Sequence, residues 1–142
     1  MRRLVFLLVL VLFGAAAGAR AAPTCHGITV SAVAFASYDV YSAAQQSVPG
    51  TITYTCPPPL APTVTIDVGL NAAGGQRNMR LTTGTDLLQY DVYFDAACTQ
   101  LWAPGVAQAP SASPMTFYAC LPPLQDVSVG SYGDTLTVTF NF

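Results

Sequence analysis

Apolar and polar side chains alternate along several short stretches of the chain, and the clearest alternation lies at its end. Leu136, Val138, Phe140 and Phe142 fall on one face of the last stretch, with three polar residues between them. A period of two is typical of a β-strand with one buried face. Because the sequence ends within this stretch, we expect its apolar far edge to be paired with, or covered by, another segment.

The same alternation predicts further strands over residues 28–35, 51–56, 63–70, 87–94 and 115–120, with a short edge strand over 77–81. In the first of these, Ile28, Val30, Ala32 and Ala34 share a face, and Pro49-Gly50 predicts a turn before the second. Lysine and glutamate, two good helix formers, are absent. Short strands at regular spacing, with Gly and Pro between them, favour an all-β sandwich.

The first residues have the pattern of an export signal. Met1-Arg2-Arg3 precedes an apolar run from Leu4 to Phe13, which is shorter than the roughly 20 residues that cross a bilayer. Ala19-Arg20-Ala21 is a typical cleavage site, so we predict a signal peptide over residues 1–21 and one secreted domain over 22–142. A lipid anchor on Cys25 is disfavoured, because Thr24 is not the small residue that such processing requires.

Charge narrows the possible partners. Two arginines and seven aspartates follow residue 21, so the predicted mature chain is acidic. An acidic surface disfavours nucleic acid and anionic membranes as partners. A polar β surface that is merely poor in charge would give the same composition.

The candidate chemistry points away from an enzyme and towards disulfides. Cys25, Cys56, Cys98 and Cys120 make an even set in an exported chain, which predicts two disulfides. Zinc is disfavoured because there is no C-x-x-C pair and His26 directly follows a cysteine. Asp91 and Asp95 would lie roughly 13 Å apart in a strand, which is too far for a catalytic carboxylate pair. We therefore expect no catalytic residue, no metal and no cofactor.

Three segments, in this order, resemble one family. They are Val-Ala-Phe-Ala-Ser-Tyr-Asp at 33–39, Leu-Gln-Tyr-Asp-Val-Tyr-Phe-Asp-Ala-Ala at 88–97 and Gly-Ser-Tyr-Gly-Asp-Thr-Leu-Thr-Val at 130–138. Together with residues 50–56 and Arg77-Asn78-Met79, they make the mature chain similar to the spore coat protein U domain, a secreted bacterial domain that also forms subunits of archaic chaperone–usher pili.

This resemblance implies an immunoglobulin-like sandwich that lacks its last strand. In such pilus subunits a periplasmic chaperone fills the gap, and an extension of another subunit then replaces it by β-strand addition. An outer-membrane usher and other pilus or coat subunits are the implied further partners, and the implied location is the periplasm in transit and then the cell surface. Leu136, Val138, Phe140 and Phe142 would line the groove for the donated strand.

The resemblance also bears on the disulfides and on assembly. It implies the pair Cys25–Cys56 and leaves Cys98–Cys120 as an addition to the family pattern. Polymerising subunits carry a long alternating extension before their first cysteine, whereas only Ala22-Pro23-Thr24 follows the predicted cleavage site here. We therefore expect this subunit to accept a strand without giving one, as at the end of a fibre.

Two proline-containing loops are candidate adhesive surfaces, on the expectation that both lie at the same end of the sandwich. Their residues are Pro57, Pro58, Pro59 and Leu60 in the first loop and Leu101, Trp102 and Pro104 in the second. The alternative is that these prolines only block edge pairing. Two other functions also fit the sequence: a self-complete secreted binding domain, and a spore or cyst coat protein that assembles without strand donation.

Peptide mapping under non-reducing conditions tests the disulfide prediction. We expect linked peptides for Cys25–Cys56 and Cys98–Cys120, and a peptide that joins Cys56 to Cys98 would contradict this pairing. Loops of this length should each contribute roughly 3 to 4 kcal/mol in the chain-entropy model, so reduction should strongly lower the free energy of unfolding.

Overall fold

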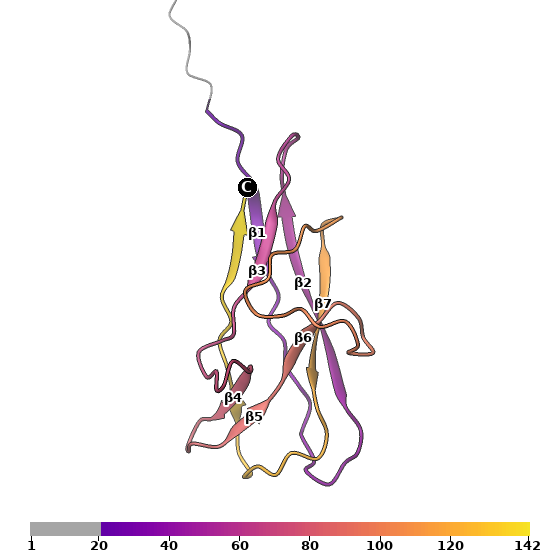
Figure 1. The fold of residues 1–142 in the computed structure, drawn as a ribbon, viewed down its shortest axis with the longest axis vertical. Helices are drawn as coiled ribbons and strands as arrows, with labels where there is room; N and C mark the ends of the chain where they lie inside the picture. The colour runs from indigo at the N-terminus through magenta and orange to yellow at the C-terminus, as the bar shows by residue number, and fades with distance from the viewer. Residues whose placement is uncertain (1–20) are drawn as a thin grey trace, which may run out of the picture.

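The computed structural model describes residues 21–142, so the predicted signal peptide lies outside the described residues except for Ala21. Antiparallel β-strands form three sheets within this part of the chain, which confirms the all-β prediction (Figure 1). The largest sheet, in the order β1-β2-β7-β6, consists of β1 (His26–Val30), β2 (Gln46–Thr55), β7 (Met115–Leu121) and β6 (Asp91–Tyr93). The smaller sheets pair β3 (Thr63–Ile66) with β9 (Val138–Asn141), and place β4 (Asn78–Leu81) between β5 (Leu87–Gln89) and β8 (Tyr132–Gly133).

The core lies between the large sheet and the two smaller ones. Ile52 and Phe117 contribute from the large sheet, and Val64 and Ile66 from β3, with relative exposures of 4% or less. Trp102 is fully buried and stacks on Phe94 with a centroid distance of 5.0 Å. The four strand residues are the inward members of the alternating patterns, so burial of one strand face holds the sheets together.

A buried guanidinium ties the sheets to one another. Arg77 is fully buried and pairs with Asp91 of β6 at 2.6 Å. It also donates to the carbonyl oxygens of Ile66, Asp67 and Trp102. A buried charge is tolerated when it is paired and its donors are satisfied, and this one has four acceptors on three segments.

The strand predicted over 51–56 begins earlier, at Gln46, and the turn predicted at Pro49-Gly50 is wrong. Both residues lie inside β2, opposite Tyr118 and Phe117 of β7. A Cβ atom on Gly50 would lie 2.2 Å from the Phe117 ring, so glycine is required for ring packing and not for a turn. The backbone of Thr51 hydrogen-bonds to Ser31, on the side of β2 away from β7. Because Pro49 lies two residues before Thr51, its nitrogen faces the same side. The described residues place no strand partner there, so the missing N–H of Pro49 breaks no ladder bond.

The strand predicted over 87–94 is divided between two sheets. β5 belongs to the sheet with β4, and β6 belongs to the large sheet. Tyr90 lies between them and donates its backbone N–H to Arg77 O at 3.1 Å. The apolar residues on both sides of this stretch therefore reflect a change of sheet.

One side of the molecule is closed by a segment without regular strand structure, residues 100–108, which we call the closing segment. Trp102 N donates to Val92 O of β6 at 2.8 Å, and Gly105 N donates to Ile66 O of β3 at 2.8 Å. Gln108 exchanges two backbone hydrogen bonds with Val64, each 2.8 Å long. The closing segment thus bonds to the outer edges of both β6 and β3.

Two disulfides reinforce the large sheet. Cys25 is bonded to Cys56, which joins the start of β1 to the end of β2, and Cys98 is bonded to Cys120 of β7. The described residues include no helix with the length and apolar character needed to cross a membrane.

Replacement of Arg77 by methionine tests the role of the buried guanidinium. Arg77→Met should remove the cationic partner of Asp91 and one donor from each of three carbonyl oxygens, which should lower the free energy of unfolding by about 3–5 kcal/mol. Urea denaturation of the oxidised protein measures this loss. Arg80→Met is the matched control, because Arg80 is exposed on β4, and it should change the free energy by no more than about 0.5 kcal/mol. Equal effects of the two variants would contradict this role.

Candidate functional site

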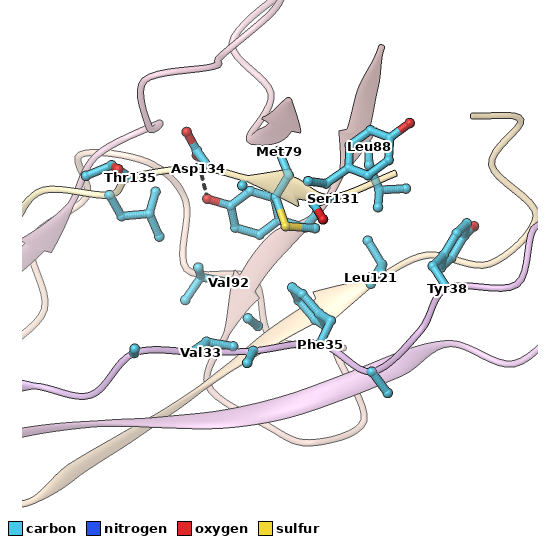
Figure 2. A pocket seen from close by; sticks show the side chains of 18 of the residues that line it. Val33, Phe35, Tyr38, Met79, Leu88, Val92, Leu121, Ser131, Asp134 and Thr135 are labelled. Atoms are coloured by element: carbon cyan, nitrogen blue, oxygen red, sulfur yellow. Dashed lines mark hydrogen bonds between the residues drawn. The ribbon is translucent and has the colours of Figure 1, made fainter. Parts of the chain in front are cut away.

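A cavity of about 720 Å³ opens on the side of the molecule where β1 and β9 lie, and its walls are two extended segments (Figures 1 and 2). The first rim is residues 31–38, which continue the chain after β1. The second rim is residues 130–138, which lead into β9. The two rims come from opposite ends of the described chain and face each other across the core.

The first rim is extended but belongs to no sheet. Ser31 N bonds to Thr51 O at 2.9 Å, and beyond it residues 32–38 make no backbone-to-backbone hydrogen bond within the described chain. The rim is fixed at its other end by Tyr38, whose hydroxyl donates to Pro122 O and accepts from Gln125 N. The strand predicted over 28–35 therefore ends at Val30, because β2 presents Pro49 where the ladder would continue.

Val33 and Phe35, rather than the predicted set of Ile28, Val30, Ala32 and Ala34, are the residues of this stretch that pack on the core. Figure 2 shows Phe35 pointing from the first rim into the cavity. The stretch is apolar at both parities from Ala32 on, so its pattern alone does not identify the inward face.

The second rim has one paired edge and one open edge. Ser131, Thr135 and Thr137 accept backbone bonds from Thr82, Leu70 and Asp67 on the neighbouring segments. In an extended chain, successive residues direct their N–H and C=O groups to opposite edges. The backbone groups of the even-numbered residues Tyr132, Asp134, Leu136 and Val138 therefore face the cavity side.

The floor of the cavity is apolar. Leu88, Val92, Phe117 and Leu121 line it and are all buried. Ala119 of β7 is the small buried residue among them. An occupant of the cavity would thus meet aliphatic and aromatic side chains below it and unpaired backbone on both sides.

The lining also contains hydroxyl-bearing residues, such as Ser131 and Thr135, and one hydrogen-bonded carboxylate. Asp134 accepts from the Tyr90 hydroxyl at 2.7 Å, a bond drawn as a dashed line in Figure 2. It also accepts from Asn71 N at 3.1 Å and from Asn71 Nδ2 at 3.0 Å. Burial of the phenol, together with the Asp134 carboxylate beside it, raises the pKa of Tyr90, so its hydroxyl stays protonated as a donor.

Two of the four residues predicted to form the groove line this cavity. Leu136 and Val138 are lining residues. Phe140 lies further along β9, where its ring packs against Tyr54 with a centroid distance of 5.4 Å. Phe142 is 54% exposed and does not line the cavity.

The two loops predicted as adhesive surfaces lie in different settings. Residues 57–60 connect β2 to β3 as a turn closed by a bond from Leu60 N to Pro57 O, and Pro58 and Pro59 are exposed. Leu101 and Pro104 belong to the closing segment, where Leu101 is half exposed. Trp102 is fully buried, so its side chain belongs to the core and is not available to a contact surface.

Several cavity residues were not identified from the sequence. The first rim and the pair Tyr90–Asp134 are the main omissions. Asp134 is in phase with Leu136 and Val138, so extending that alternation towards the N-terminus would have placed it on the inward face. The sequence carries no signal that the two rims face each other across the cavity, because their positions depend on where the chain crosses from one sheet to another.

The described residues contain no group of three or more His, Cys, Asp or Glu side chains arranged to hold a metal ion. The features available at this site are therefore apolar surface, unpaired backbone and one hydrogen-bonded carboxylate.

Comparison with known proteins gives a family and a related structure. The family model described as Spore Coat Protein U domain matches residues 11–139. A search of the curated proteins finds no significant match. Among solved structures, the chain is similar to one in the CsuC–CsuE chaperone–tip adhesion subunit pre-assembly complex from archaic chaperone–usher Csu pili of Acinetobacter baumannii. That similarity has a TM-score of 0.54 and 25% sequence identity, over 85% of this chain and 40% of the other.

Proposed function

Because the chain belongs to the Spore Coat Protein U domain family, we propose that it is a secreted subunit of a chaperone–usher pilus or surface coat, and that its groove accepts an extended strand from another protein. One observation carries this proposal. The walls of an apolar cavity are two extended segments whose backbone groups on the cavity side have no partner in the described chain.

The geometry suits an extended occupant. From Tyr132 to Val138 the second rim is about 20 Å long at ~3.3 Å per residue, and the first rim is of similar length. A strand laid between them would satisfy backbone groups on both sides and bury alternate side chains on the apolar floor. It would supply the missing strand of an immunoglobulin-like sandwich, which is the mode of recognition known as β-strand addition.

The proposed order of partners follows the related complex. That structure holds a pilus subunit with a chaperone before assembly. We extend this to the present chain: a periplasmic chaperone fills the groove first, and a strand from a neighbouring pilus or coat subunit replaces it at an outer-membrane usher. The two disulfides fit a route through an oxidising compartment to the cell surface.

The proposed place of the subunit is the end of a fibre. The similar chain comes from the structure of a chaperone–tip adhesion subunit pre-assembly complex, and the present chain covers 40% of that chain's length. Within this proposal, the exposed prolines of residues 57–60 and the half-exposed Leu101 are the candidate contact residues.

Peptide binding tests strand acceptance. A nine-residue peptide that alternates valine with lysine or threonine should bind the exported, oxidised protein. At a concentration 100 times its Kd it should add about 2.7 kcal/mol to the free energy of unfolding and raise the Tm by roughly 10 °C. Differential scanning calorimetry measures the shift. A peptide of the same composition with its valines adjacent is the control, and it should give little shift.

A pair of neighbouring substitutions locates the binding. Val138→Asp places a charge on the inward face of the second rim and should abolish the peptide-induced shift. Thr139→Asp is the matched control, since Thr139 is exposed on the same strand, and it should keep the shift. If the protein without peptide is a monodisperse, protease-resistant monomer and no peptide shifts its Tm, a self-complete binding domain is the better interpretation.

The terminal position makes a separate prediction. The purified subunit, freed from its chaperone and incubated alone, should form no ladder of homopolymers on denaturing gels run without heating. A subunit known to donate a strand should cap it as a single heterodimer band. Ladders from this chain alone would exclude the terminal position while leaving strand acceptance intact.

A further inference from the structure

Among the described residues, Asp134 is the one charged side chain that lines the cavity. Along the second rim it occupies the inward position between Tyr132 and Leu136, and the rest of that face is apolar or aromatic. A strand that fills the groove would cover this carboxylate and remove it from water. The hydrogen-bonding state of Asp134 therefore determines which side chain can be placed over it.

The carboxylate is only partly satisfied by the protein. Within residues 21–142 it accepts three hydrogen bonds, two from Asn71 at Oδ1 and one from the Tyr90 hydroxyl at Oδ2. An ionised carboxylate has about four acceptor sites, and a phenol oxygen that donates one bond can still accept another. Once water is excluded, this pair keeps acceptor capacity for a donor from the occupant.

The space above this pair is narrow. Phe35 of the first rim meets the Tyr90 ring edge to face, with centroids 6.5 Å apart. Figure 2 shows Phe35 directed into the cavity from the wall opposite Asp134. The Phe35 ring therefore lies against the Tyr90 ring at this level, and a long side chain from the occupant would have to displace it.

We propose that the strand that fills the groove carries a short hydrogen-bond donor, serine, threonine or asparagine, opposite Asp134 and Tyr90, with larger apolar side chains at the inward positions on either side. This inference rests on the proposed function, because it concerns the occupant of the same groove. A purely apolar residue there leaves buried acceptor sites unpaired, and an acidic residue there meets a like charge. Asp134 with Tyr90 is thus a specificity-determining pair that distinguishes among alternating strands.

Isosteric peptides test this proposal. The valine-alternating peptide and a variant with threonine at its central inward position differ by a hydroxyl in place of a methyl group. The threonine variant should bind the wild-type protein roughly tenfold more tightly, as measured by isothermal titration calorimetry, because it satisfies an otherwise unpaired acceptor. A variant with aspartate at the same position should bind more weakly than both.

Two protein variants show whether the preference comes from this pair. In Asp134→Leu the acceptor is gone, so the valine peptide should bind as tightly as the threonine peptide or more tightly. In Tyr90→Phe the ring stays while the carboxylate loses its hydroxyl partner, so the threonine preference should grow, and an unchanged or lost preference would overturn the proposal. Tyr90→Phe keeps the packing of the core and so tests the proposal even if Asp134→Leu fails to fold.

The possible outcomes distinguish a failure of strand acceptance from a failure of the specificity proposal. If no alternating peptide binds the wild-type protein, strand acceptance itself fails. If the peptides bind and the wild-type protein prefers valine or shows no preference, the specificity proposal is overturned while strand acceptance stands. A threonine preference that survives unchanged in folded Asp134→Leu also overturns it, because the donor would then have another partner.

Discussion

The arrangement of the sheets depends on the buried guanidinium of Arg77. Its bonds reach β6 through Asp91, the end of β3 through Ile66 and Asp67, and the closing segment through Trp102. Apolar side chains could bring the sheets together in many relative positions, since the hydrophobic effect has no direction. The four acceptors around one planar group are compatible with few such positions, so they hold the end of β3, β6 and the closing segment in fixed relative places.

The sheet edges are paired on one side of the molecule and left open on the other. On one side the closing segment hydrogen-bonds to the edges of β6 and β3. On the other side residues 21–142 supply two extended rims and no strand between them. The proposed binding site is thus a consequence of where backbone pairing stops, and it needs no side chain with special reactivity.

The sequence predicts much of the strand content but little of the groove. Alternation identifies β3, β7 and β9 because each has one face on the core. It misses the first half of β2, since Pro49-Gly50 is a turn pattern whose true reason is the Phe117 ring packed over Gly50. It also misses the first rim, because the loss of pairing after Val30 depends on the opposing strand, which lies twenty residues away in sequence. Asp134 was recognised as part of a motif but not as an inward side chain, as its partners Tyr90 and Asn71 come from segments far away in the chain.

The closing segment also limits the number of sides at which another strand can add to the subunit. A β subunit with two open sides could recruit a strand at each, and such subunits would associate into branched or sheet-like aggregates. Here the edges of β6 and β3 are already occupied by the subunit's own backbone, so neither edge is open to the strand whose binding we propose. In the proposed assembly, these two closed edges would keep further strands from adding on that side of the subunit.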